Sequence, residues 1–182
     1  MSASPPFLTL LAWEGPMLRA YVSALRHRGI GVRRVVTLAP KQAPGSGKPV
    51  GRWLPGRLRT LYAARMADAR LNYWPRKLKQ EAPGLVAAMR SKLSARFAFF
   101  ERFFADVDGP ADYAGWAGVH DVVLADGLAD PAVADAMADA GTVLYTGGGI
   151  VPASLLATRG ASFLHIHPGV LPHVRGADGL LW

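Results

Sequence analysis

Cysteine is absent from this chain of 182 residues. Disulfide bonds, thiolate nucleophiles and zinc sites built on cysteine are therefore excluded, and the absence fits a reducing, cytoplasmic setting. The chain also lacks any run approaching the roughly 18 uncharged apolar residues that a membrane helix needs. No basic residue precedes the first short apolar run, residues 7–13, so the pattern of a secretory signal is missing. We expect a soluble, cytoplasmic protein without a membrane partner.

Acidic residues are scarce in the middle of the chain. Most lysines and arginines lie between residues 41 and 102, where the only acids are Asp68, Glu81 and Glu101, and this segment accounts for the net charge of +8. The remainder is slightly acidic. Such a basic segment either attracts phosphates and nucleic acid or forms a solvated helical insertion. The helical insertion, at about residues 41–104, is the interpretation that we favour.

The hydrophobic content of 51% predicts a single globular domain spanning residues 1–182. Apolar, β-branched runs predict strands at residues 7–13, 32–38, 121–125, 142–146 and 162–166, with helical patterns between them. A strand, a helix and a strand at the spacing of the first 38 residues form a βαβ unit, which implies a parallel sheet with right-handed crossovers. The predicted fold is therefore α/β, with a doubly wound, mostly parallel, Rossmann-like sheet.

Within the basic segment we expect helices at residues 57–71 and 83–104, while Trp74-Pro75 interrupts residues 72–82 too strongly for a helix. Two sets of apolar side chains in this segment are expected to pack in a core. The first set is a helical stripe formed by Leu85, Met89, Leu93, Phe97 and Phe100, and the second comprises Trp53, Tyr62, Tyr73 and Trp74. The alternative for the second set is stacking on RNA bases.

Three glycines, Gly147, Gly148 and Gly149, follow the strand predicted at residues 142–146. Without Cβ atoms, the backbone there can turn tightly or approach a ligand closely, and the pattern alone does not separate these roles. The dinucleotide fingerprint GxGxxG is absent. Ligands of open parallel sheets bind at the carboxyl ends of the strands, so this position is a candidate site.

Two histidines, His165 and His167, end the last predicted strand. Side chains two residues apart point to the same face of a strand, so both imidazoles should lie together. Metal binding would need a third ligand, and only His173 and Asp178 are near, so we predict no metal site. An acid/base role suits the pair better, because histidine titrates near neutral pH.

The end of the chain resembles the N-terminal domain of 10-formyltetrahydrofolate-dependent formyltransferases. This family acts on glycinamide ribonucleotide, on initiator methionyl-tRNA and on some amino sugars. Residues 165–176, HIHPGVLPHVRG, match the family signature N-x-H-P-[SG]-x-L-P-x-x-[RK]-G in register, except that a histidine replaces the asparagine. The similar stretch covers residues 142–182, and the first βαβ unit is compatible with the family.

The resemblance implies transfer of a formyl group from 10-formyltetrahydrofolate to an amine through a tetrahedral intermediate. It makes His167 the general acid/base and gives His165 the position of the residue that stabilises the oxyanion. It also implies that main-chain groups of Gly147, Gly148, Gly149, Ile150 and Val151 line the pterin pocket. The expected acceptor is a small-molecule amine, with tRNA as a less favoured alternative.

One departure from the family concerns the carboxylate that orients its catalytic histidine. The resemblance places this aspartate well beyond His167, past Trp182, and Asp178 lies too early to be called its replacement. We therefore expect either a piece of a longer enzyme, inactive by itself, or a folate-binding module that has lost the reaction.

Overall fold

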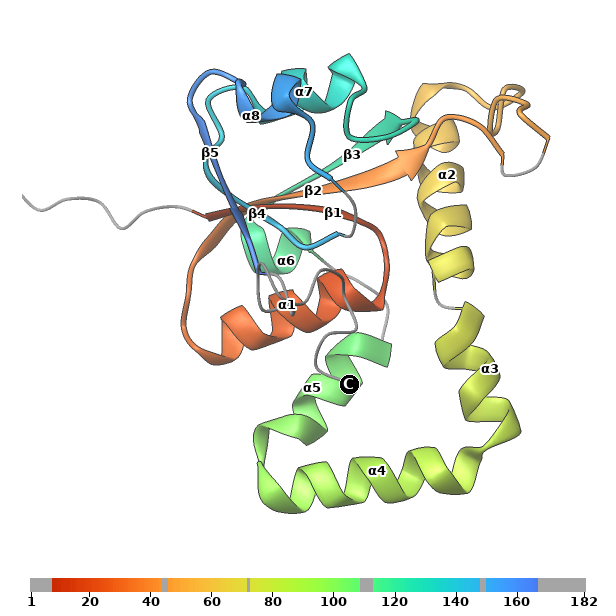
Figure 1. The fold of residues 1–182 in the computed structure, drawn as a ribbon. Coiled ribbons are helices and arrows are strands. Elements are labelled where there is room, and N and C mark those ends of the chain that lie inside the picture. The colour runs from red at the N-terminus through yellow and green to blue at the C-terminus, as the bar shows by residue number, and fades with distance from the viewer. Residues whose placement is uncertain (1–7, 44–45, 72, 109–112, 148–149, 167–182) are drawn as a thin grey trace, which may run out of the picture.

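The computed structural model describes residues 8–43, 46–71, 73–108, 113–147 and 150–166. Its centre is a sheet of five parallel strands in the order β3-β2-β1-β4-β5 (Figure 1). The strands are β1 (Leu8–Trp13), β2 (Val32–Pro40), β3 (Val119–Ala125), β4 (Gly141–Tyr145) and β5 (Ala161–His165). Their positions and their parallel pairing confirm the predicted strands and the doubly wound α/β architecture.

Helices cover both faces of the sheet. The helices α1 (Pro16–His27) and α6 (Ala114–Ala117) lie on one face, and α7 (Pro131–Met137) and α8 (Ala153–Leu156) lie on the other (Figure 1). Neighbouring residues of β1 point to opposite faces. Leu10 packs in the cluster that contains Leu18 of α1, whereas Leu11 packs in the cluster that contains Met137 of α7. Both faces are therefore apolar, as parallel sheets require.

The chain order of the strands reverses beside β1. From β1 the chain adds β2 and β3 on one side, and it then returns to place β4 and β5 on the other. The connections after β1 and β4 consequently leave toward opposite faces of the sheet. This topological switch point lies between the carboxyl ends of two adjacent strands, which is where open α/β sheets bind ligands.

The basic segment forms four helices outside the sheet, namely α2 (Gly56–Leu71), α3 (Tyr73–Glu81), α4 (Pro83–Arg96) and α5 (Phe99–Asp108). In Figure 1, α2 stands beside the ends of β2 and β3, α5 packs against α1, and α3 and α4 connect them as an arch away from the sheet. In the described part of the chain, no helix of the arch or elsewhere is long and apolar enough to cross a membrane.

The carboxylate of Asp108, the last residue of α5, joins that helix to α3 and α4. Lys79 of α3 and Arg90 of α4 both donate hydrogen bonds to it from their charged groups. Partial burial raises the pKa of Asp108, but the hydrogen bonds and positive charges of Lys79 and Arg90 outweigh this effect and hold it below its usual value.

The structure corrects the prediction that residues 72–82 are too interrupted for a helix. The helix α3 begins at Tyr73, so Pro75 falls in its first turn. The first backbone N–H groups of a helix have no intrahelical acceptor, and a proline there loses no hydrogen bond.

The prediction of one helix over residues 83–104 with an apolar stripe in a core was also wrong. The backbone of Phe97 is extended and separates α4 from α5. No described residue of α4 is buried, and Leu85 and Met89 are 57% and 54% exposed. These side chains of α4 are therefore open to solvent, and the aromatic rings of α5 pack mainly on one another and on α1.

The aromatic residues expected in the core of the insertion also differ from the prediction. Trp53 is 73% exposed, and its ring lies 5.9 Å from that of the exposed Tyr62. The side chains of Tyr73 and Trp74 lie outside the described residues. The described pair is therefore a surface feature near the start of α2.

We predict that Asp108→Ala loosens the arch without unfolding the sheet. Loss of the shared carboxylate should destabilise α3 and α4 by about 1 kcal/mol, given its partial exposure, and hydrogen exchange of their amides should accelerate. Because the folded pKa is lowered, this stabilisation is present above the unfolded value of about 3.9 and is lost as pH falls through the folded value. Unchanged exchange in α3 and α4 at neutral pH would contradict the prediction.

Candidate functional site

The carboxyl ends of all five strands lie along one edge of the sheet, because every pairing is parallel. The residues that follow the two strands at the switch point are Glu14 after β1 and Thr146 after β4. The predicted site residues follow or end β4 and β5 at the same edge. The candidate site is built around these ends.

Tyr145 connects the predicted site residues that the structure describes. Its side chain is buried in the core cluster under α7 and α8, and burial raises its pKa. It pairs in register with His165, and their rings lie 5.5 Å apart on the same face of the sheet. Tyr145 therefore remains protonated at neutral pH, and its buried ring packs beside the imidazole of His165.

The backbone of Tyr145 also orients His165. The imidazole Nδ1 lies 3.0 Å from the carbonyl oxygen of Tyr145. A carbonyl oxygen can only accept a hydrogen bond, so Nδ1 carries the proton. In the neutral ring Nε2 is then an acceptor, and it becomes a donor only when the imidazole is doubly protonated. This hydrogen bond fixes what His165 can do chemically.

Gly147 has no room for a side chain. A Cβ atom at this position would lie 2.5 Å from the hydroxyl oxygen of Tyr145 and 2.7 Å from the ring carbon that bears it. The buried ring cannot move away without disturbing the core. Glycine at position 147 is thus required by the preceding tyrosine, a reason that the sequence pattern of three glycines does not reveal.

The other predicted site residues divide into two groups. Val151 is half-buried and packs against the core cluster that contains Tyr145, whereas Ile150 is 92% exposed. His167, Gly148 and Gly149 lie outside the described residues. The structure thus brings Gly147, Val151 and His165 to the same side of the sheet.

A buried ionic cluster under α1 was not predicted. The Oε1 atom of Glu14 accepts a hydrogen bond from Arg19 at 3.1 Å and another from the hydroxyl of Tyr113 at 2.9 Å. All three side chains are buried. Burial and the negative charge of Glu14 raise the pKa of Tyr113 well above its usual value, so its hydroxyl stays a donor. The only local signal was an acid directly after the first apolar run.

Thr146 places a second polar group at the switch point. The residue is only 7% exposed, and its hydroxyl has no hydrogen-bond partner among the described residues. Its backbone N–H donates to the carbonyl of Leu11, which continues the pairing of β4 with β1. A buried hydroxyl without a partner is uncommon and suits a position beside a ligand.

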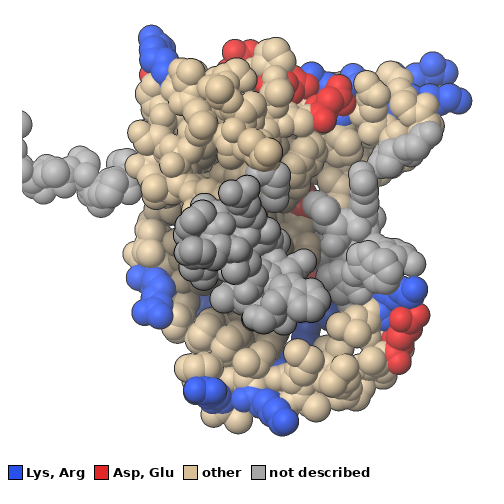
Figure 2. Space-filling view, in the orientation of Figure 1, with Lys and Arg blue, Asp and Glu red and all other residues tan. Residues whose placement is uncertain are grey.

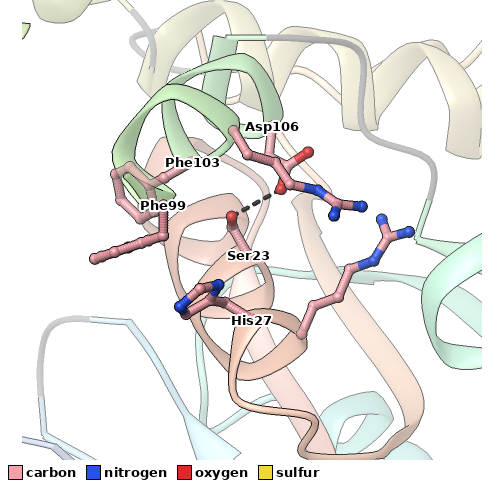
Figure 3. Close-up of a pocket in the computed structure, with 7 residues that line it drawn as sticks. Ser23, His27, Phe99, Phe103 and Asp106 are labelled. Atoms are coloured by element: carbon pink, nitrogen blue, oxygen red, sulfur yellow. Dashed lines mark hydrogen bonds between the residues drawn. The ribbon is translucent and has the colours of Figure 1, made fainter. Parts of the chain in front are cut away.

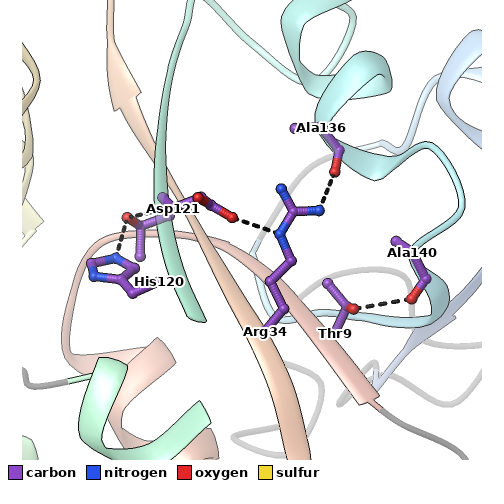
Figure 4. Close-up of polar contacts among 7 residues, drawn as sticks. Thr9, Arg34, His120, Asp121, Ala136 and Ala140 are labelled. Carbon is purple, nitrogen blue, oxygen red and sulfur yellow. Dashed lines mark hydrogen bonds and ion pairs between the residues drawn. The ribbon is translucent and has the colours of Figure 1, made fainter. Parts of the chain in front are cut away.

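A further group of polar contacts lies along β2 and β3 (Figure 4). Arg34 extends between the carboxylate of Asp121, at 2.6 Å, and the carbonyl of Ala136 at the end of α7, at 2.7 Å. Thr37 lies 2.9 Å from Nε2 of His120. These contacts join strands to each other and to a helix, so we interpret them as structural.

The described residues contain no group of three histidine, aspartate or glutamate side chains that could hold a metal ion. Comparisons of the chain with protein-family models, with curated proteins and with solved structures find no match. The functional interpretation therefore depends on the residues at the carboxyl edge.

We predict that Gly147→Ala destabilises the protein by about 1–3 kcal/mol, the usual range for an overpacked core. Denaturant unfolding would measure the change. Gly127→Ala is a matched control, since a Cβ there meets no atom within 4 Å. In a Tyr145→Leu background the added methyl group should be tolerated much better. An equal loss in both backgrounds would show that the clash with Tyr145 is not the cause.

Proposed function

We propose that this protein transfers a formyl group from 10-formyltetrahydrofolate to an amine. The observation that carries the proposal is the imidazole of His165, which Tyr145 orients at the carboxyl edge of the sheet. The family resemblance of residues 142–182 assigns the catalytic histidines and the pterin-binding loop to these same strand ends. The parallel sheet and its switch point are compatible with such a site.

In the proposed reaction the amine nitrogen of the acceptor attacks the formyl carbon. His167 accepts the proton that the amine loses and returns it to the leaving nitrogen, N10 of the folate, as the bond between N10 and the formyl carbon breaks. Proton transfer by a positioned group of this kind accelerates a reaction by about 10²–10⁴-fold. The folate supplies the formyl group, and main-chain groups of residues 147–151 would hold its pterin ring.

The hydrogen bond from His165 to Tyr145 specifies how His165 would assist. With Nδ1 donating to the carbonyl, only a doubly protonated imidazole can offer Nε2–H to the developing oxyanion. A positive charge on this ring would also help to neutralise the oxyanion. It would disfavour protonation of His167 through repulsion, which keeps that residue ready to accept a proton.

We predict that His167→Ala in the full encoded protein lowers formyl transfer by about 10²–10⁴-fold while leaving the affinity for reduced folate nearly unchanged. His165→Asn should retain most of the activity, because an amide donates a hydrogen bond without needing an added proton. Turnover with 10-formyltetrahydrofolate and an amine acceptor, together with a folate titration, would measure both effects. A folded protein that binds no folate at millimolar concentration would refute the proposal.

A second candidate makes the acceptor amine part of a tRNA. The exposed ring pair of Trp53 and Tyr62, flanked by the exposed Arg52 and Arg57, favours it, because bases stack on such rings beside basic groups. However, the lysines and arginines of the described residues that Figure 2 shows stand in separate places around one face. A small-molecule acceptor therefore remains the first choice.

The tRNA candidate predicts that Trp53→Ala weakens tRNA binding by about 1–3 kcal/mol, the usual contribution of one stacked base. Affinity should also fall steeply as salt concentration rises. Leu61→Ala is a suitable control, because Leu61 is an exposed apolar residue of α2, the helix that carries Tyr62. Equal binding by both variants, measured by fluorescence anisotropy, would exclude stacking on this ring pair.

A further inference from the structure

A small pocket lies between α1 and α5, on the side of the sheet opposite Tyr145. Its volume is about 40 Å³, enough for a few water molecules or one small ion. Ser23, Arg26 and His27 of α1 line one side, and Phe99, Arg102, Phe103 and Asp106 of α5 line the other (Figure 3). The pocket contains neither the residues around Tyr145 nor the ring pair of Trp53 and Tyr62.

The aromatic rings that line this pocket pack against other rings of the protein. The ring of His27 stacks on Phe99 with the centroids 4.8 Å apart, and the ring of Phe100 also stacks on Phe99, at 4.4 Å. Phe103 meets Phe99 edge-on at 6.0 Å. These contacts hold His27 in place and leave little ring surface for a planar ligand. A ligand would therefore be recognised through the charged and polar groups.

The charges around the pocket favour an anion. In the part of the chain that the structure describes, neither Arg26 nor Arg102 forms an ion pair. The guanidinium of Arg26 lies 5.4 Å from the ring centre of Trp116, a contact that leaves its edge N–H groups available. The carboxylate of Asp106 accepts a hydrogen bond of 2.7 Å from the hydroxyl of Ser23. Two guanidinium groups and one carboxylate, which is already hydrogen-bonded, thus line the pocket.

The combination of Ser23, His27 and Asp106 does not form a catalytic triad. In a triad the serine donates to the histidine, and the histidine donates to the carboxylate. Here the serine hydroxyl donates directly to Asp106, and His27 contacts a phenyl ring instead. The serine is therefore not activated as a nucleophile, and the pocket is better suited to binding than to catalysis.

We propose that this pocket binds a tetrahedral oxyanion, specifically a phosphate group. Arg26 and Arg102 would donate charge-assisted hydrogen bonds to its oxygens, since guanidinium groups match the geometry of phosphate. His27 can supply a further N–H from its stacked position. The phenyl rings of Phe99 and Phe103 form the apolar part of the lining, while Arg26, His27 and Arg102 stay accessible to an anion from solvent.

The test is a titration of the folded protein with inorganic phosphate at constant ionic strength, followed by nuclear magnetic resonance. The amides near His27 and Arg102 should shift, and Arg26→Gln/Arg102→Gln should weaken binding at least about tenfold, as expected for loss of charged hydrogen bonds. Arg65→Gln/Lys92→Gln is the control, because it removes the same charge from exposed helix positions and should leave the affinity unchanged.

Three further measurements make the test decisive. The variants must show the same unfolding midpoint without phosphate, and if the double variant does not fold, Arg102→Gln alone replaces it. Tighter binding of a phosphomonoester such as glycerol phosphate would identify a phosphorylated molecule as the occupant, whereas tighter binding of inorganic phosphate would identify the free ion. Folate binding should be unaffected by the variants, which separates this proposal from formyl transfer. No saturable shift, or equal weakening in the control, would overturn the proposal.

Discussion

The arrangement of the molecule depends on β1, which is enclosed on both faces and paired at both edges. It pairs with β2 on one side and β4 on the other, while Leu10 and Leu11 pack into opposite core clusters. Because β1 is the first of the five strands in the chain, neighbours on both of its sides require the chain to return across it, which creates the switch point. Glu14 directly follows β1 and Thr146 directly follows β4, and these two strands are neighbours, so both residues lie at the switch point. The position of the candidate site is thus a consequence of how the central strand is covered.

The two faces of the carboxyl edge have different physical characters. On the α1 face, Glu14 is held by Arg19 and by the hydroxyl of Tyr113. Removing one member of such a buried pair typically destabilises a protein by about 3–5 kcal/mol. We therefore interpret this cluster as structural rather than reactive. On the opposite face, Tyr145 orients an imidazole that is more than a third exposed. Chemistry at this edge is therefore expected on the face under α7 and α8.

The strands and the doubly wound architecture could be predicted because they depend on local apolar runs and on general rules of chain connection. The errors involve distant residues. Whether the stripe containing Leu85 meets a partner depends on the path of the arch, which Asp108 helps to fix through helices α3 and α4. The partners Glu14 and Tyr113 are 99 positions apart, so no local pattern indicates them. Pro75 was misinterpreted because its effect depends on where the helix starts.

The glycines and the histidines do not support the proposed function equally. Gly147 must be glycine simply because the ring of Tyr145 fills the space of a side chain, and this would be true in a protein that binds no folate. The structure does not confine His165 in the same way, since the residue is exposed and only its Nδ1 is held by the carbonyl of Tyr145. An imidazole differs from an amide in being able to take up a proton near neutral pH. With Nδ1 bound to the carbonyl of Tyr145, Nε2 of His165 is the atom left to reach an oxyanion, and the ring can donate from Nε2 only after it takes up that proton, which an amide at this position would not need.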